Sequence, residues 1–357
     1  MVQTHIVVGA GIIGAATAFQ LCKAGQRVIV ISAGQADATS AAFGWINASF
    51  FINEDHHVLR VAGLAAWRRA MSDLPLSVDW QGCLCWDLPD AQMHKTYARL
   101  RAFNYPVELY DAAQIAALVP ALRNGPGRAL FFPREGAASS AEIAGQFLAA
   151  AQDMGARLIR NIRVTGIRMQ AGRAVGVETT QGLIKADHVV IAAGTGTAAI
   201  AESIECHVPL VPRPAYILRT TPHAHLLQHI LATPGGEIRQ EPSGQFLLPV
   251  AVAHQADQSE VLAQDPVAAA EGALARLQTH FAGLDDLAWA EIIRAERPVP
   301  ADDLPIVGSV ADGVYVAVMH SGITLGPIMG ELISKDIGGR LSNADQALLA
   351  PYRPDRF

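Results

Sequence analysis

The sequence is poor in cysteine and has no long apolar run. It contains four cysteines, and no two of them form a CxxC pair, so we expect neither a disulfide framework nor a bound metal. No uninterrupted apolar segment is long enough to cross a bilayer. No Lys or Arg precedes the apolar N-terminal stretch, as a signal peptide would require. We therefore expect a cytoplasmic protein that is not transmembrane, with peripheral attachment to the inner face of a membrane left open.

Positive charge is also scarce, which limits the classes of partner. The formal net charge is −6, and basic residues are spread along the chain rather than clustered. A nucleic acid is therefore not an expected partner. The 357 residues, half of them apolar, are enough for one large core or two moderate ones, and we expect two domains.

The first 32 residues predict a βαβ unit. The β-branched run THIVVG is followed by a helical pattern that stops near Gly25 and then by the strand RVIVIS. Between the first strand and the helix, Gly9, Gly11 and Gly14 form a GxGxxG motif, which is typical of dinucleotide binding. The helix N-terminus would face the pyrophosphate with free N–H groups. The alternative is a glycine turn with only a steric role.

Ser32 stands at the end of the second strand, where an acidic residue would normally hold the ribose diol. A hydroxyl forms weaker hydrogen bonds than a carboxylate. We expect Ser32 and the backbone of Ala33 to contact the adenosine ribose nevertheless. The missing charge also reduces the bias against a 2′-phosphate, as in NADP.

Four sequence blocks lie across nearly the whole chain: VVGAGIIGAATA, ATSAAFGWINASF, ADHVVIAAGTGT, and RPVPADDLPIVG followed by GVYVAVMHSGITLGP. Together they resemble the D-amino acid oxidase (DAO) family of FAD-dependent oxidoreductases, which includes glycine oxidase, sarcosine oxidase and D-amino acid dehydrogenase. The resemblance implies an α/β fold: a Rossmann-like FAD-binding domain (residues 1–73, 133–205 and 296–357) and a discontinuous α+β substrate domain on a mixed sheet (74–132 and 206–295).

The resemblance also implies which residues hold a non-covalent FAD, since no attachment motif is present. The glycine turn, the loop after Ala38, and the chain around Val164 and Ala193 would contact the dinucleotide. The helix that follows residue 320 would also contact FAD. The expected contacts are Gly9, Ala10, Gly11, Ile12, Ile13, Gly14, Ser32, Ala33, Thr39, Ser40, Ala41, Ala42, Gly44, Trp45, Asn47, Val164, Ala193, Gly194, Ser321, Gly322, Ile323 and Thr324. For Trp45 the alternative is an ordinary core aromatic.

The C-terminal block carries the expected chemistry. A buried strand, VYVAVMH, precedes a helix whose N-terminus would stabilise negative charge on a reduced flavin. His320 would tune the flavin or contact substrate, or be a structural histidine. Arg297 offers a planar fork for a substrate carboxylate, the alternative being an ion pair with Asp302 or Asp303. Tyr216 is a weaker candidate for the same pocket.

Arg239 is a second weak candidate. The histidines of HAHLLQH, His223, His225 and His229, would have metal-ligand spacing only if the segment were helical, and no acidic or cysteine partner accompanies them. A solvated loop is the expectation.

The reaction that the resemblance implies is oxidation of a C–N bond. A hydride of a D-amino acid, glycine, N-alkyl amino acid or opine would pass to flavin N5, and the imine would hydrolyse. None of the four lysines falls in a block placed over the flavin, which favours a dehydrogenase passing electrons to a quinone or partner subunit. The alternatives are an FAD-binding subunit of a multi-subunit amine dehydrogenase, a non-catalytic structural subunit, or a nicotinamide enzyme.

Overall fold

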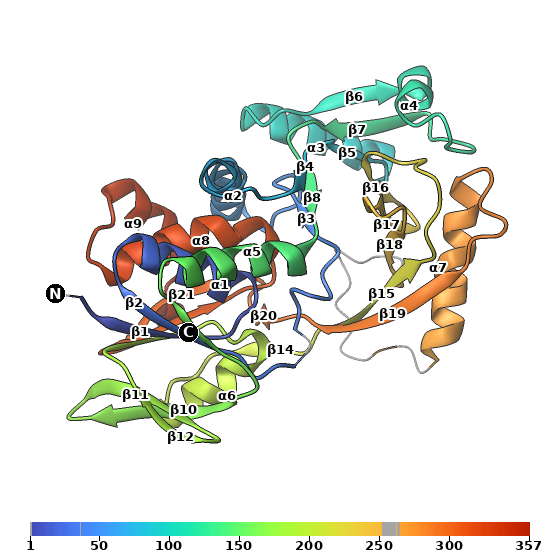
Figure 1. Cartoon of the computed structure of the whole chain (residues 1–357). Coiled ribbons are helices and arrows are strands. Elements are labelled where there is room, and N and C mark those ends of the chain that lie inside the picture. Colours follow the sequence, from blue (N-terminus) through green and yellow to red (C-terminus); the bar gives the residue numbers. More distant parts are fainter. Residues whose placement is uncertain (1, 36, 252–261, 263–264) are drawn as a thin grey trace.

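The computed structural model describes residues 2–35, 37–251, 262 and 265–357. The chain forms two large sheets, one of six strands and one of eight, that lie next to each other in Figure 1. The first is parallel except at one edge, and the second is mixed. The expected α/β fold with a second, mixed sheet is confirmed.

The six-stranded sheet contains the predicted βαβ unit. Its order is β21-β22-β13-β1-β2-β9, and only β21 runs antiparallel to its neighbour. The central strands are almost entirely buried and apolar, as expected for a parallel sheet covered on both faces. The strands are β1 (Thr4–Val8), β2 (Arg27–Ile31), β9 (Arg157–Ile159), β13 (His188–Ile191), β21 (Ile306–Ala311) and β22 (Val314–Val318).

Helices cover one face of this sheet and a small meander covers the other (Figure 1). Val7 packs into the helical core, whereas its neighbours Ile6 and Val8 pack into the meander side. The helices are α1 (Ile12–Lys23), α2 (Glu54–Asp73), α5 (Ser140–Asp153), α8 (Gly322–Ile337) and α9 (Asn343–Leu349). The meander has three strands, β10 (Val164–Gln170), β11 (Arg173–Thr179) and β12 (Gly182–Lys185), and packs with α6 (Thr197–Ala201).

The eight-stranded sheet has the order β19-β15-β18-β17-β16-β5-β7-β6 and its own apolar core. Its strands are β5 (Cys83–Cys85), β6 (Glu108–Asp111), β7 (Arg128–Phe132), β15 (Pro214–Thr220), β16 (Ile230–Thr233), β17 (Gly236–Gln240), β18 (Phe246–Pro249) and β19 (Trp289–Glu296). The associated helices are α3 (Asp90–Ala102), α4 (Ala112–Leu118) and α7 (Pro266–His280). Both sheets draw on the sequence segments expected for them, but the division into two domains stays a prediction.

Short strands lie where the chain passes between the two sheets. They are β3 (Trp45–Ile46), β4 (Val78–Asp79) and β8 (Gly136–Ala138) in one small sheet, and β14 (Leu210–Val211) and β20 (Val299–Pro300) in another. Short 3-10 turns complete the elements of the described residues: η1 (Gly194–Gly196), η2 (Glu202–Ile204), η3 (Ala350–Tyr352) and η4 (Pro354–Arg356).

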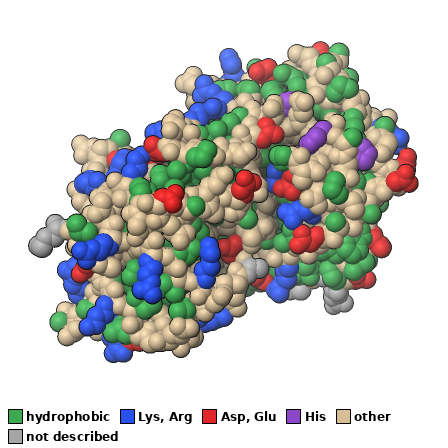
Figure 2. All heavy atoms as spheres, in the orientation of Figure 1, with side chains coloured by type: hydrophobic (Ala, Val, Ile, Leu, Met, Phe, Trp, Pro, Cys, Tyr) green, Lys and Arg blue, Asp and Glu red, His purple; other side chains and the backbone are tan. Residues whose placement is uncertain are grey.

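Two further features are the distribution of charge on the surface and the apolar character of the helices. On the face shown in Figure 2, the Lys and Arg side chains are interspersed with Asp and Glu. Across the described residues, no helix has both the length and the apolar character that crossing a membrane requires.

Candidate active site

A cavity of about 950 Å³ joins the glycine turn to the edge of the eight-stranded sheet. Such a volume lies at the upper end of the roughly 300–1,000 Å³ typical of ligand and cofactor sites. The predicted residues that line it are Gly9, Ala10, Gly11, Ile12, Ile13, Ser32, Ala33, Thr39, Ala41, Ala42, Gly44, Trp45, Asn47, Val164, Ala193, Gly194, Arg297, His320, Ser321, Gly322, Ile323 and Thr324. Gly14, Ser40 and Tyr216 are not among the lining residues.

The glycine turn is shaped by contacts that only glycine permits. Gly9 has a φ of 112°, and a Cβ there would lie 2.2 Å from the carbonyl oxygen of Ala192. A Cβ at Gly14 would lie 2.1 Å from the carbonyl oxygen of Gly9. Gly14 therefore lets α1 approach β1 closely, although it does not line the cavity.

The N-terminus of α1 opens into the cavity. Its N-cap is Gly11, which has no side chain to cap the helix, and the first turn carries no acidic residue. The hydroxyl of Thr39 accepts a hydrogen bond of 3.0 Å from the Ile12 N–H, which satisfies one of the donors that a helix N-terminus leaves open. Ser40 instead bonds back to Asp37, its N–H donating to Oδ1 at 2.8 Å. This end can bind an anion such as a pyrophosphate.

The part of the cavity predicted for adenosine lies at the carboxyl ends of β1 and β2. Ser32 lines the cavity there, and its hydroxyl accepts a 3.2 Å hydrogen bond from the Gly34 N–H. Val164 and Gly194 line the same cavity from β10 and η1. A ligand crevice at this edge is the usual position in open parallel sheets.

The opposite end is built around the N-terminus of α8. The hydroxyl of Thr324 accepts a 3.2 Å hydrogen bond from the Asn47 N–H and donates to the Trp45 carbonyl oxygen at 3.4 Å. Ser321 occupies the N-cap position without capping the helix. The α8 N-terminus therefore keeps donors available to a ligand in the cavity.

Arg60 was not predicted as a site residue. It lies on α2, is only 5% exposed, and lines the cavity beside Asn47 and Ser321. Burial lowers the pKa of Arg60 to about 10, and the nearby charge of Glu135 opposes that shift, so the guanidinium is charged at neutral pH. The one sequence signal was its spacing, because Arg60, Gly63 and Trp67 share one helical face that the structure buries.

Glu135 is a second residue that sequence reasoning missed. Its carboxylate is fully buried and accepts hydrogen bonds from the Trp45 indole (3.1 Å), the N–H groups of Ala48 (3.0 Å) and Ser49 (2.9 Å), and the Tyr105 hydroxyl (2.9 Å). Burial raises the pKa of Glu135, and these donors oppose the rise. Glu135 thus fixes the loop that carries Trp45 and Asn47 along the cavity.

Arg297 is buried at the cavity wall, next to β20. Its Nε donates to the Arg213 carbonyl oxygen at 2.9 Å, which fixes the plane of the guanidinium. Asp302, one of the two alternative partners, pairs instead with Arg356 at 2.8 Å. Arg297 lines the cavity, and its role in binding a carboxylate stays a prediction.

Two of the other polar candidates do not line the cavity. Tyr216 lies between Ala215 and Ile217, which line the cavity, and its side chain packs on the second apolar core instead. Alternation along β15 points it to the other face of the sheet. Arg239 forms an ion pair with Glu241 at 2.8 Å and does not line the cavity. His320 does line it, and its side chain is exposed.

The three histidines of residues 223–229 lie in an irregular segment, not a helix. Their rings contact backbone carbonyl oxygens: His223 those of Ala224 and Gly283, His225 that of Pro242, and His229 that of Gln81. The helical spacing that metal ligation would have needed is therefore not formed. Within the described ranges, no group of three or more His, Cys, Asp or Glu side chains is arranged to hold a metal ion.

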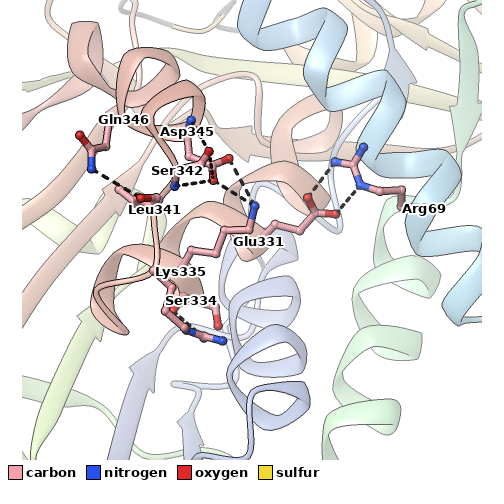
Figure 3. Close-up of polar contacts among 9 residues, drawn as sticks. Arg69, Glu331, Ser334, Lys335, Leu341, Ser342, Asp345 and Gln346 are labelled. Carbon is pink, nitrogen blue, oxygen red and sulfur yellow. Dashed lines mark hydrogen bonds and ion pairs between the residues drawn. The ribbon is translucent and has the colours of Figure 1, made fainter.

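Helices α2, α8 and α9 are tied together away from the cavity (Figure 3). Arg69 on α2 holds both carboxylate oxygens of Glu331 on α8, at 3.0 and 2.7 Å. Lys335, one turn further along α8, pairs with Asp345 of α9 at 3.2 Å. These contacts join the three helices away from the cavity.

The cavity suits FAD in three respects. The glycine turn leaves room that any Cβ would fill. The α1 N-terminus, whose N-cap Gly11 has no side chain, can receive the pyrophosphate, and the space continues to a second helix N-terminus that can face the flavin. The residues present therefore fit the extended shape and the charge of this cofactor.

Comparison with known proteins agrees with this fit. The profile of the family described as FAD dependent oxidoreductase (DAO) matches residues 5–335. The glycine oxidase of Pseudomonas aeruginosa is 25% identical over 99% of this chain and 99% of its own, and the D-amino acid dehydrogenase of Cereibacter sphaeroides is 27% identical over 72% and 61%. The crystal structure of glycine oxidase from Geobacillus kaustophilus superposes with a TM-score of 0.87 at 23% identity, covering 99% of both chains. The chain belongs to the DAO family of FAD-dependent oxidoreductases.

Proposed function

We propose that this protein uses a non-covalently bound FAD to oxidise the C–N bond of an amino acid or a related amine. The observation that carries the proposal is one continuous cavity, lined at one end by the glycine turn and at the other by the buried Arg297. The candidate substrates are D-amino acids, glycine, N-alkyl amino acids and opines. The names of the relatives, glycine oxidase and D-amino acid dehydrogenase, support this class.

The chain's own residues would bind and orient the substrate. Arg297 would hold its carboxylate in two charge-assisted hydrogen bonds, because Arg213 already fixes the guanidinium plane. The bound flavin would supply the acceptor for a hydride from the carbon next to nitrogen. Positioning of the neutral amine would account for most of the catalysis, so no side-chain base is required.

We favour a dehydrogenase over an oxidase. Two of the four lysines are engaged at the surface, Lys23 with Asp73 and Lys335 with Asp345. Neither these nor Lys95 of α3 and Lys185 of β12 line the cavity, so no lysine is placed to activate oxygen there. A quinone or a partner subunit is the proposed electron acceptor.

The cofactor proposal is tested on the purified protein. We expect a yellow protein that releases FAD on denaturation, with flavin absorbance that bleaches when a substrate is added without oxygen. The panel contains D-amino acids, glycine, N-methyl amino acids and opines. A folded, colourless protein that takes up no added FAD would refute the cofactor proposal, and bound FAD that no panel member bleaches would refute the substrate class.

The role of Arg297 has its own test. In Arg297→Met, the loss of charge-assisted hydrogen bonds should weaken binding of a carboxylate substrate about tenfold to a hundredfold. The control is Arg219→Met, since Arg219 lies on β15, pairs with Glu291 and does not line the cavity. An Arg297→Met protein with unchanged affinity would show that Arg297 does not bind the carboxylate.

A further inference from the structure

We propose that Arg60 is a buried cation that stabilises the flavin in its negatively charged, reduced state and so raises its reduction potential. This inference rests on the proposed FAD site and adds a role for a residue that no sequence motif identifies. It would make the charge of one α2 side chain a determinant of how readily this protein accepts a hydride.

Three hydrogen bonds fix the Arg60 side chain. Its Nε donates to the Asn47 carbonyl oxygen at 3.1 Å, Nη2 to Asn47 Oδ1 at 2.5 Å, and Nη1 to the Ser321 hydroxyl at 2.6 Å. A guanidinium has five N–H groups, and the described residues supply acceptors for only these three. Buried donors normally have partners, so the remaining two suit an acceptor atom of a ligand in the cavity.

Arg60 also affects which hydrogen-bond donors the α8 N-terminus leaves open to a ligand. A serine at the N-cap would normally accept a hydrogen bond from the helix, but the Ser321 hydroxyl accepts one from Arg60 and does not cap α8. The uncapped N–H groups and the guanidinium therefore lie at the same end of the cavity. Both contribute positive potential at that end of the cavity.

No acidic side chain neutralises Arg60 directly. Among the described residues, no carboxylate lies within ion-pair distance of its guanidinium. The charge of Glu135 is the main effect that opposes the lowering of the Arg60 pKa, and the Glu135 oxygens already accept four hydrogen bonds from the Trp45–Ser49 segment and Tyr105. His56 adds no charge at neutral pH, because burial, with Arg60 as the next cause, lowers its pKa to about 3.

The cavity order places Arg60 at the flavin end. The GxGxxG turn and Ser32 define the end for the pyrophosphate and adenosine. Arg60 lines the cavity at the N-terminus of α8, where it bonds to Asn47 and to Ser321, the N-cap residue. When a neutral ring accepts a hydride, the ring gains one negative charge. A fixed cation nearby stabilises that charged state.

The test compares Arg60→Met with wild type and with Arg69→Met. Arg69 is a matched control, because it lies on the same helix and also bonds to α8, through Glu331, but is at the surface and away from the cavity (Figure 3). The readouts are FAD content, the flavin midpoint potential, and the dissociation constant of sulfite. Sulfite adds through its sulfur lone pair to the oxidised ring and leaves a negative charge on it.

We expect Arg60→Met to weaken sulfite binding at least about tenfold and to lower the midpoint potential. For a two-electron couple, a tenfold change in the equilibrium constant corresponds to about 30 mV. Arg69→Met should match wild type in both readouts. An Arg60→Met protein that retains FAD with an unchanged potential and unchanged sulfite affinity would overturn the proposal. A wild-type protein that binds no FAD would instead refute the underlying site.

Two further variants cover the case in which Arg60→Met loses FAD. Asn47→Asp keeps the oxygen that accepts from Arg60 but adds a negative charge beside it, so sulfite binding should weaken about tenfold or more. Arg60→Lys keeps the charge and should stay within a few-fold of wild type. The proposal fails if Asn47→Asp holds FAD and binds sulfite as wild type does.

Discussion

The two ends of the cavity are built in different ways. The glycine turn, α1 and β2 come from one continuous stretch, residues 4–32, and its contacts are set by glycines within it and by the adjacent β13 end. The end that we propose for the flavin draws on Asn47, Arg60, Arg297 and the start of α8, which are far apart in sequence. The first end therefore depends on local backbone shape, and the second on how α2 packs against α8.

The largest expected effect comes from filling the glycine turn. Gly9→Ala forces a Cβ to within 2.2 Å of the Ala192 carbonyl oxygen at a φ of 112°. Backbone strain and overpacking together should lower the free energy of unfolding by about 2–6 kcal/mol and abolish FAD binding. The measurements are denaturant unfolding and the FAD content of the purified protein.

Gly25→Ala is the control for Gly9→Ala. Gly25 also has a positive φ, 76°, but a Cβ there meets nothing within 4 Å. The free energy of unfolding of Gly25→Ala should fall by only about 1 kcal/mol, and the variant should keep FAD. Equal losses in the two variants would show that conformational strain alone, without the close contact, explains the requirement for glycine.

At the flavin end, Glu135→Gln should destabilise the fold by about 2–4 kcal/mol. The amide cannot accept from all four donors, because its NH₂ group must face a donor such as the Trp45 indole. Unfolding free energy and FAD affinity should fall together. Glu331→Gln, a surface change facing Arg69, should lose no more than about 1 kcal/mol. Unaltered stability in Glu135→Gln would mean that the loop does not depend on this carboxylate.

The packing of α2 on α8 predicts a coupled pair. Pro327 lies inside α8 and has no N–H to donate to the Ile323 carbonyl oxygen; the Trp67 indole donates to that oxygen instead, at 3.0 Å. Trp67→Phe should therefore lose about 1–2 kcal/mol through an unsatisfied buried acceptor. In a Pro327→Ala background the restored N–H should reduce that loss, which a double-mutant cycle measures. Independent, additive effects would rule out this compensation.

The smallest expected effect is a pH dependence that arises away from the cavity. Burial, followed by the charge of His188, lowers the pKa of His5 to about 4, and the two rings stack at 5.0 Å. As pH falls below about 6.5, the unfolded chain takes up a proton that folded His5 does not, so stability decreases until about pH 4.

The first part of that decrease in stability should appear as a lower Tm at about pH 6 than at about pH 7.5. These two pH values are compared because the ordinary pKa of histidine lies between them. His5→Phe, which retains a ring against His188, should show a smaller drop, because one of the responsible groups is gone. A drop of the same size in both proteins would assign the pH dependence to other groups.

Much of the fold could be predicted because its signals are local. A β-branched run, a glycine turn, a helical period and a second strand all occur within 32 residues, and their order leaves one arrangement. The predicted cavity residues are mostly backbone positions in such motifs, and their roles as contacts stay predictions. Tyr216 was misplaced relative to the cavity because alternation along β15 decides its face, and the sequence alone left that register open.

By itself, the sequence determined a dinucleotide turn, a buried parallel sheet and a C-terminal helix that begins after a strand. Only the tertiary structure decided that Arg60 and Glu135, ordinary charged residues in the linear chain, lie buried against the Trp45–Ser49 loop. The reason is physical: a glycine turn is specified by steric contacts over a few residues, whereas a buried charge depends on donors and acceptors that distant segments bring to it.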